Sequence, residues 1–533
     1  MRINMIKIFS LLLAFFMLAA CNDEFLDLDN PEAYDENTYF KTQEQINSAV
    51  IATYATLLHR GMHSRDWYFI FDLMGSDAMK NTFLLGDDAE FYNFSFNNTN
   101  PRLQELWDTN YRMRTRAVIV IDKVDEWEPG NIDEARMQPI YKGEGYFMKS
   151  FAYFNLVRMF GAIPYADSWE DVKDTDNLAR ARTDESVVYD SIVADLQRAI
   201  QRLPESWDNE NKGRATKYSA LALLGKVYLT MGEFALAREQ FMEIVNSDKF
   251  SMWDGKTGYS KQFTSANWNS PETIFDVRHN WYGWSEGNAY HMFGGNETWG
   301  GRAANTGRAM EYGFNDWWNV FVATAAVESF NYSLEGSPYL DPRSSLVFYG
   351  NPNEGGDGDW AGGNYDFRAK GNSWKKYNRY ESIVKEGNPT SDINTQLIRY
   401  ADVLLMIAET YIFQDQYAEA LPYINEVRRR VGAAEYTTVP SSFDEAFEIL
   451  RRERRVELVG EQHRWFDLKR WHLADKSSDA GFDMVAVINA DRDQDTKNDL
   501  KDMQEKYIYL PIPINEIQNN PNLDNSLNYP SWN

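Results

Sequence analysis

Side chains that could perform acid–base or metal chemistry are few in this sequence and poorly spaced for it. The chain has six histidines, and only His59 and His63 stand four residues apart, with Gly61 between them and no glutamate where a zinc-binding H-E-x-x-H helix requires one. There is no G-x-S-x-G nucleophile elbow, no Walker loop and no G-x-G-x-x-G fingerprint between a strand and a helix. We therefore predict no metal and no cofactor, and these spacings do not favour an enzyme.

Carboxylates are abundant, with 80 Asp and Glu residues, and any two of them could lie at the spacing that glycoside hydrolysis needs. The sequence leaves a surface hydrolase open without favouring it. One run, Asp491, Asp493 and Asp495, begins like a calcium loop, but Thr496 replaces the turn glycine and Asp502 the bidentate glutamate. We predict an acidic surface loop there in preference to a calcium site.

Aromatic rings that could stack on sugars are the richest chemical feature of the chain. Residues 251–398 hold 9 of the 17 tryptophans and 19 of the 32 glycines, and they lack long helical periodicity. A sugar has C–H groups on its faces and hydroxyls on its rim, so a protein that binds it presents exposed rings beside Asn, Asp or Arg. A few stacked rings, at about 1–3 kcal/mol each, give micromolar to millimolar affinity.

The overall composition excludes several classes of function. Lys and Arg number 54 against 80 Asp and Glu, a net charge of −26, which argues against nucleic-acid binding because that requires clustered cations. A single cysteine cannot form an internal disulfide. The hydrophobic fraction of 43% provides ample material for a packed core, so the chain as a whole is not disordered.

The N-terminus is typical of a lipoprotein signal peptide. Arg2 and Lys7 precede an apolar stretch, residues 8–18, that is too short to span a bilayer as a helix. The stretch ends at Ala19, Ala20 and Cys21, which resemble the bacterial lipobox in which the cysteine is lipidated. No other run approaches 18 apolar residues, so we expect acyl chains on Cys21 to hold the mature body at a membrane.

The elements that position the aromatic residues are predicted to be helices. Apolar side chains recur at three- and four-residue intervals in residues 104–124, 145–160, 187–203, 218–229, 234–245, 401–413, 418–431 and 443–459. Alternation typical of a strand is scarce, and residues 506–510 before Pro511 are the best candidate. The chain is therefore expected to be mainly α-helical.

Two helix pairs match the spacing of a tetratricopeptide unit. The first has matching residues at Leu221, Leu224, Gly225, Tyr228, Gly232, Ala237 and Phe241. The second fits less fully, at Leu404, Ala408, Tyr411, Ala420 and Ile424, with Asp415 where the turn glycine would be. Residues 145–160 and 187–203 could form a further, degenerate pair, and a generic helical hairpin is the alternative for each. Two or three such units are too few to form a free-standing solenoid. Other elements must therefore cover their exposed faces.

Four segments in chain order resemble the SusD/RagB family of surface glycan-binding lipoproteins. They are residues 145–164, 399–409, 451–471, which begin with the letters RRERRVEL, and 510–521. The resemblance implies an all-α fold with tetratricopeptide-like helix pairs in a right-handed superhelix, a large irregular loop-rich insertion and few short strands. It also implies an outer-membrane location facing the cell exterior and partnership with a SusC-like TonB-dependent transporter.

The resemblance also implies a division of the chain. We expect the signal peptide over residues 1–20 and a single body over residues 21–533. Within the body we expect helical repeats over about 34–250 and 399–475. The ligand-facing insertion would occupy residues 251–398, and a C-terminal capping segment residues 476–533.

In the family, ligand contacts come from the irregular stretch after the first helices and from the large insertion. These regions correspond here to residues 83–94 and 281–299. The predicted ligand-binding residues are Trp281, Trp284, Trp299, Tyr290, Phe83, Tyr92, Asp87 and Asn93. We expect the three tryptophans to form a stacking platform, with Tyr290 at its edge and Phe83 or Tyr92 opposite. The two polar side chains would contact hydroxyls.

The family motifs themselves are predicted to be structural. The arginines and glutamates of residues 451–458 are typical of a solvated helix face or an ion-pair network, with contact to ligand or transporter as the alternative. His463 is interpreted as a structural histidine in preference to an acid–base residue. The tryptophans assigned to packing are Trp107, Trp317, Trp318 and Trp465.

The predicted function is non-catalytic capture of a neutral oligosaccharide or polysaccharide at the cell surface and its delivery to a SusC-like transporter. Capture of peptides or another non-glycan nutrient for the same type of transporter is the alternative, and a surface hydrolase is the third hypothesis. The sequence does not name the glycan.

Overall fold

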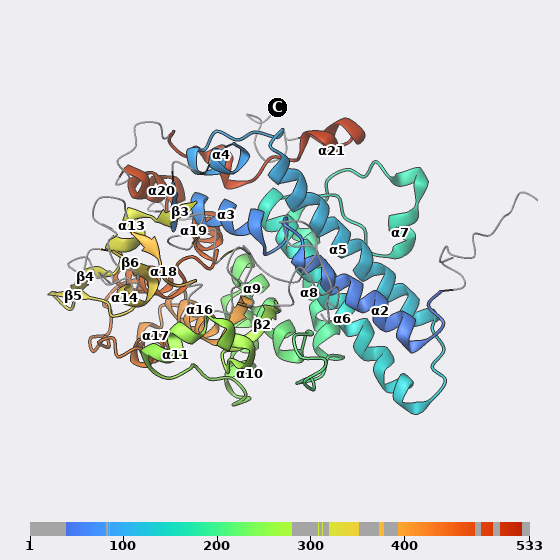
Figure 1. Cartoon of the computed structure of the whole chain (residues 1–533), viewed down its shortest axis with the longest axis horizontal. Helices are drawn as coiled ribbons and strands as arrows, with labels where there is room; N and C mark the ends of the chain where they lie inside the picture. The colour runs from blue at the N-terminus through green and yellow to red at the C-terminus, as the bar shows by residue number, and fades with distance from the viewer. Residues whose placement is uncertain are drawn as a thin grey trace, which may run out of the picture.

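The computed structural model describes residues 39–81, 84, 86–279, 308, 312, 319–350, 372–377, 393–474, 481–493 and 501–524. Helices dominate this part of the chain (Figure 1), and its four small sheets have two strands each. The predicted all-α class with few short strands is confirmed. No helix of the described residues is both long enough and apolar enough to cross a membrane.

The helices follow one another along the whole described chain. The α-helices of the N-terminal half are α2 (Gln43–Tyr54), α3 (Arg65–Met74), α4 (Asp87–Asn93), α5 (Pro101–Glu126), α6 (Ile132–Phe160), α7 (Trp169–Lys173), α8 (Glu185–Ile200), α9 (Lys217–Met231), α10 (Phe234–Val245) and α11 (Gly255–Lys261). Those of the C-terminal half are α13 (Thr324–Glu328), α14 (Ser344–Val347), α16 (Tyr400–Ile412), α17 (Tyr417–Arg430), α18 (Phe443–Leu458), α19 (Arg464–Ala474), α20 (Met484–Asp493) and α21 (Ile514–Asn519). Short 3-10 helices are η2 (Ala55–Leu58), η3 (Thr175–Asn177), η4 (Ser265–Asn269) and η7 (Glu505–Ile508).

The two longest helices, α5 and α6, pack against each other on one side of the molecule (Figure 1). Asn100 caps α5 by accepting a hydrogen bond from the Arg102 amide at 2.9 Å, and Pro101 fits the first helical position, where no amide donor is needed. A Cβ at Gly145 of α6 would lie 2.8 Å from Ile121 Cγ1. Glycine there therefore permits the close approach of the two helices.

Helices α9 and α10 form the first predicted tetratricopeptide pair. The turn between them contains Gly232 at a φ of 79°, a conformation that glycine adopts without strain. A Cβ at Gly225 would lie 2.3 Å from Phe241 Cε1, and Ala237 and Phe241 are fully buried. The small residues therefore allow the helices to cross closely, as the spacing predicted.

Helices α16 and α17 form the second pair. Leu404, Ala408, Ala420 and Ile424 are buried at their interface positions. Asp415 has a φ of 59° in the turn, so it adopts the left-handed conformation that Gly232 adopts in the first pair. Asp415 therefore replaces the turn glycine without changing the geometry of the turn.

The strands are short, and one pair closes the irregular region. They are β1 (Ala78–Lys80), β2 (Thr273–Val277), β3 (Val320–Val322), β4 (Asn331–Leu334), β5 (Ser337–Leu340), β6 (Phe348–Tyr349), β7 (Ser373–Trp374) and β8 (Thr395–Arg399). The pairs are β1–β3, β2–β8, β4–β5 and β6–β7, all antiparallel. In the second of them Val277 lies opposite Thr395, so residues near the two ends of the predicted insertion lie side by side.

The strand predicted at residues 506–510 is wrong. Residues Glu505–Ile508 form the 3-10 helix η7. The Tyr507 hydroxyl donates to the carbonyl of Phe94, and the Leu510 amide donates to the carbonyl of Met159 at 2.9 Å. Contacts to α6 and to the chain after α4 therefore replace the partner that a strand would need.

Tryptophans assigned to packing lie in the core where they are described. Trp107 is 3% exposed and Trp465 1% exposed, which confirms both assignments. Trp317 and Trp318 lie outside the described residues. A smaller second core, built from Tyr68, Phe69 and Trp374 among others, lies between α3 and the short strands.

Candidate functional site

The predicted ligand-binding residues fall in two groups. Phe83, Trp281, Trp284, Tyr290 and Trp299 lie outside the described residues, and so does the lipidation site Cys21. Asp87, Tyr92 and Asn93 all belong to the short helix α4. Only the second group has a described geometry.

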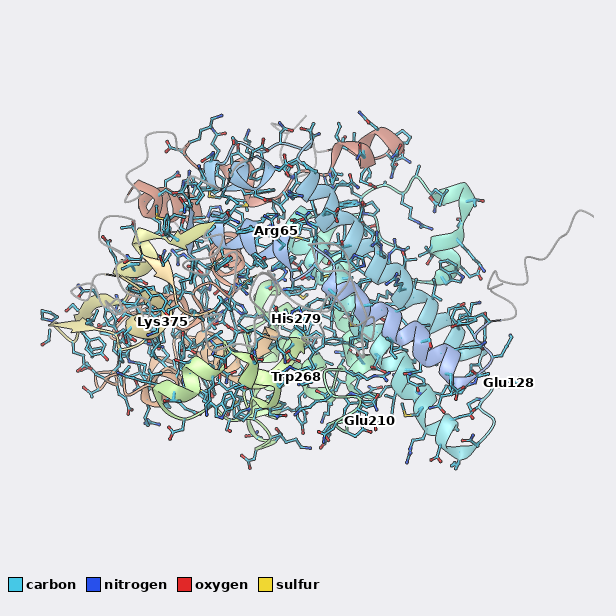
Figure 2. The ribbon with its side chains drawn as sticks, viewed as in Figure 1. Arg65, Glu128, Glu210, Trp268, His279 and Lys375 are labelled. Carbon is cyan, nitrogen blue, oxygen red and sulfur yellow. The ribbon has the colours of Figure 1, made fainter. Side chains whose placement is uncertain are left out.

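Asp87 and Asn93 lie on the outer face of α4. The side chain of Asp87 is 44% exposed, with Oδ2 3.9 Å from Arg102 Nη2, and Asn93 is half-buried. Asp88, the next residue, is buried and pairs at 2.9 Å with Arg65, the first residue of α3, which is labelled in Figure 2. The outer face thus keeps two polar side chains within reach of solvent, as hydroxyl contacts would require.

Tyr92 is a correction to the sequence-based site. Its ring is 1% exposed and lies beneath the Arg492 guanidinium, with Cζ 5.3 Å from the ring centroid. Asp88 and Tyr92 are four residues apart and share the buried face of the helix, whereas Asp87 and Asn93 lie outside that face, about 120° apart around the helix axis. Because its ring is in the core, Tyr92 is not available to stack on a sugar.

Two residues of the predicted insertion are anchored to the helical body. Arg308 donates to Asp72 Oδ2 of α3 at 3.3 Å and to the carbonyl of Gly460. The Tyr312 hydroxyl donates to the same Asp72 carboxylate at 2.5 Å. The Arg308 guanidinium also lies 3.8 Å from the centroid of the Tyr377 ring. The insertion is therefore tied to α3 and to the turn after α18 through buried polar contacts.

The charged motif of residues 451–458 faces the interior. Glu457 is fully buried, and its carboxylate accepts hydrogen bonds from the guanidiniums of Arg343, Arg399 and Arg430, the first two at 3.0 and 2.7 Å. Glu453 accepts from Arg343 at 2.6 Å. Of the two structural interpretations of this motif, the ion-pair network is confirmed, and the inward-facing charges are not a solvated face.

Glu461 extends this network beyond the end of α18. It accepts from Arg399 Nε and from Lys376 Nζ, both at 2.7 Å. Burial alone would raise the pKa of Glu461, but the two cations outweigh it and lower the pKa to about 2. The carboxylate is therefore ionised at neutral pH.

Of the acidic residues suggested as a calcium loop, Asp491 lies in helix α20 and is engaged by two cations. Asp491 Oδ2 lies 3.1 Å from Arg455 Nη2 and 2.8 Å from Arg464 Nη2. Asp495 and Thr496 lie outside the described residues. Across the described part of the chain, no cluster of three His, Cys, Asp or Glu side chains could hold a metal ion.

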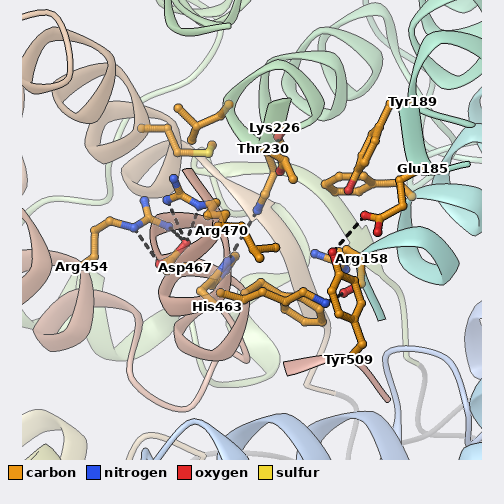
Figure 3. A pocket seen from close by; sticks show the side chains of 16 residues that line it. Arg158, Glu185, Tyr189, Lys226, Thr230, Arg454, His463, Asp467, Arg470 and Tyr509 are labelled. Carbon is orange, nitrogen blue, oxygen red and sulfur yellow. Dashed lines mark hydrogen bonds and ion pairs between the residues drawn. The ribbon is translucent and has the colours of Figure 1, made fainter. Parts of the chain in front are cut away.

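A cavity of about 290 Å³ lies between helix α9 of the first tetratricopeptide pair and the C-terminal motif (Figure 3). Its wall comes from α6, α8, α9, α16, α18 and α19, with His463 and Tyr509 from connecting segments. Figure 3 shows Arg454, Asp467 and Arg470 joined on one side and Glu185 bonded to Tyr509 on another. Phe154, Tyr189 and Phe466 supply aromatic surface.

His463 lies in the wall of this cavity and is uncharged at neutral pH. Its Nδ1 is 3.8 Å from Asp402 Oδ2 and 3.5 Å from Lys226 Nζ. Burial lowers the pKa of His463 to about 4, since the nearby Asp402 does not compensate for the loss of water. Lys226 bonds the same Asp402 carboxylate at 2.9 Å. The histidine therefore sits within a set of fixed charges, consistent with the structural interpretation.

Sequence reasoning missed the cations of the cavity wall. Arg158 of α6 and Lys469 of α19 both lie within segments that matched the family, and the motif was assigned to structure as a whole. No periodicity distinguishes an arginine that faces a cavity from one that faces solvent. These two residues are separated by more than half of the chain, and only the packing of α6 against α19 brings them together.

The chain is similar to known proteins over nearly its whole length. A family model described as "SusD family" matches residues 246–532, one described as "Starch-binding associating with outer membrane" matches residues 24–229, and a tetratricopeptide-repeat model matches residues 218–250. SusD-like protein P2 of Formosa agariphila is 25% identical over 511 residues, which cover 91% of this chain and 92% of that protein.

Solved structures share the fold over nearly the whole length. A laminarin-binding SusD-like protein has a TM-score of 0.67 and 23% identity, covering 90% of this chain and 98% of its own. Surface glycan-binding protein A from Bacteroides fluxus has a TM-score of 0.67 and 21% identity, covering 90% and 97%. The helical fold, the repeat pair and the family match over more than half of the sequence agree. This chain belongs to the SusD family.

Proposed function

We propose that this protein captures a neutral oligosaccharide or polysaccharide outside the cell and delivers it, without catalysis, to a SusC-like TonB-dependent transporter in the outer membrane. Membership of the SusD family carries the proposal. The second family description names starch binding in association with the outer membrane, and two structures of the same fold are described as laminarin-binding and glycan-binding. The lipobox at Cys21, after a leader over residues 1–20, would supply the membrane anchor.

The proposed glycan site combines the insertion with the outer face of α4. Trp281, Trp284 and Trp299 would stack on sugar faces, with Tyr290 at the edge and Phe83 opposite. On α4, Asp87 and Asn93 keep polar groups at the surface for hydroxyl contacts. A net charge of −26 favours a neutral polymer over a polyanion through long-range repulsion.

Substitution of the tryptophans tests the site. Trp281→Ala and Trp284→Ala should each weaken glycan binding at least tenfold, because one stacked ring contributes about 1–3 kcal/mol, while Tm stays within about 2 °C. Isothermal titration calorimetry against a panel of soluble neutral glucans, mannans and xylans measures the affinity.

The matched control for these variants is Trp169→Ala, a half-buried tryptophan of α7 that is not part of the proposed site. It should leave the affinity unchanged. Unaltered affinity in both insertion variants would refute the platform, and a panel with no bound glycan at all would refute glycan capture and favour the peptide alternative. Hydrolysis of a bound glycan would refute non-catalytic capture.

A further inference from the structure

Two cations in the wall of the 290 Å³ cavity have no carboxylate partner among the described residues. Arg158 and Lys469 both line the cavity, and no Asp or Glu oxygen of the described chain lies within 4.0 Å of either. The other cations of the wall are paired: Lys226 with Asp402, and Arg454 and Arg470 with Asp467. Because an unpaired buried charge is costly, this arrangement calls for an anion.

Arg158 is held by aromatic rings in place of a carboxylate. Its guanidinium lies 4.0 Å from the centroid of Phe466, 4.8 Å from that of Phe154 and 5.2 Å from that of Trp67. Nη2 donates to Asn155 Oδ1 at 2.5 Å, and within the described residues Nε has no acceptor. Stacked rings fix the plane of the guanidinium and leave its edge free for an oxyanion.

Lys469 approaches the same cavity from α19. Lys469 is 4% exposed, and its Nζ donates to the carbonyl of Arg158 at 2.7 Å and lies 3.4 Å from the centroid of the Tyr509 ring. An ammonium has three donors, and a single carbonyl satisfies one of them. The ammonium also lies near enough to the Arg158 guanidinium for the charge of Arg158 to lower the pKa of Lys469, and both side chains line the cavity.

Burial lowers the pKa of both groups, and of the two only Lys469 is brought near neutral pH. It lowers the pKa of Arg158 to about 9 and that of Lys469 to about 7, and the nearest acid that affects Lys469, Glu185, only partly offsets this. An anion bound between them would restore the charged form of the lysine. The site is thus more favourable for an anion than for a neutral molecule.

The size and walls of the cavity limit the ligand. Its volume is at the lower end of the range for small-molecule pockets, which is about 300–1,000 Å³. Aromatic rings from α6, α8 and α19 line it, and the half-buried side chains of Glu185, Tyr189 and Leu473 place part of its wall at the surface. A single ring of six-membered size fits these dimensions, and a glycan chain does not.

We propose that this cavity binds a small cyclic carboxylate, with the carboxylate between Arg158 and Lys469 and the ring among Phe154, Tyr189 and Tyr509. Glu185, which accepts from the Tyr509 hydroxyl at 3.1 Å, lies in the same wall and repels a second negative charge. A monoanion is therefore favoured over the dianion of inorganic phosphate. The site is separate from the proposed glycan platform and does not depend on it.

Calorimetry on the unaltered protein gives the first test. Benzoate and glucuronate should bind, and their neutral counterparts benzyl alcohol and glucose should bind at least tenfold more weakly. Inorganic phosphate should bind more weakly than either carboxylate. Equal affinity for charged and neutral members of a pair, no binding of either carboxylate, or tighter binding of phosphate would each overturn the proposal.

Variants locate the binding. Lys469→Met and Arg158→Gln should each weaken carboxylate binding at least tenfold, and the second remains informative if the first does not fold. The control is Lys142→Met on the same helix as Arg158, which pairs with Asp125 away from the cavity and should change nothing. Carboxylate binding that persists in both cavity variants would place the ligand elsewhere and refute the site. Binding of a neutral glycan should be retained in both variants, so failure of one proposal is distinguishable from failure of the other.

Discussion

Glu457 is the buried acid that three arginines share, each of which also pairs with another buried acid. Its carboxylate is fully buried and faces Arg343, Arg399 and Arg430. Burial alone would raise the pKa of Glu457, yet these guanidiniums hold it well below its usual range. A buried network of this kind contributes little net stability compared with an apolar core, but removal of one member leaves uncompensated charge.

Glu457→Gln should therefore lower the free energy of unfolding by about 3–5 kcal/mol. The reason is that the amide keeps the shape of the side chain and removes the charge that neutralises the arginines. Urea unfolding followed by circular dichroism measures the change. Glu435→Gln, which breaks a pair with Arg429 whose side chains are 39% and 61% exposed, serves as the control and should cost under about 1 kcal/mol. If both variants lose the same free energy of unfolding, the buried acid is no more important for stability than the exposed one.

At the scale of elements, helix pairs are fixed by a few small residues. In α9 and α10 the contact of Gly225 with Phe241 sets the distance between the helices, and Gly232 or Asp415 sets the turn in each pair. These were the positions that the repeat spacing identified. Sequence predicted them well because the constraint is local and involves residue size.

Gly225→Ala should destabilise the protein by about 1–3 kcal/mol through overpacking, although alanine favours a helix more than glycine does. The added Cβ would lie 2.3 Å from Phe241, which is fully buried and has little room to move. The matched control is Gly130→Ala, where the added Cβ would lie 3.6 Å from Glu134 Oε2, and the change should stay within about 0.5 kcal/mol. Thermal unfolding compares the two, and a neutral Gly225→Ala would show that the helices can separate without cost.

At the scale of the whole molecule, buried acids with lowered pKa values join distant parts of the chain. Glu461 links β8 through Arg399 to the segment around Lys376, and Asp402 links α16 to α9 through Lys226. The cations that surround Asp402 also hold its pKa well below its usual range, despite burial that would raise it. These pairs join segments that are far apart in sequence. Protonation of the Glu461 or Asp402 carboxylate would therefore weaken contacts between distant parts of the fold.

Acid should therefore unfold the protein through these groups. A lowered pKa in the folded state means that the unfolded state binds the proton more tightly, so the stabilisation from Glu461 is complete above the ordinary glutamate value of 4.5 and is lost as the pH falls towards 2. Urea unfolding at pH 7, 4 and 3 should show the decline. Glu461→Gln should lower stability at pH 7 and flatten the decline below pH 4.5.

The control for acid unfolding is Glu128→Gln, an exposed residue that lies at the far end of the molecule from Lys375 (Figure 2). It should keep the pH dependence of the unaltered protein. If the free energy of unfolding of Glu461→Gln falls with pH as steeply as that of the control, the buried carboxylate does not govern unfolding in acid.

The sequence by itself determined the helical class, the two repeat pairs and the family, because apolar periodicity and the sizes of residues such as Gly225 and Ala237 are local properties of the chain. It could not decide which side of α4 faces water, and Tyr92 was misplaced for that reason. Tertiary packing buried Tyr92 under Arg492, turned the charged motif inward and brought Arg158 beside Lys469 from opposite halves of the chain. Burial and long-range pairing depend on how helices assemble, and no spacing within one segment encodes them.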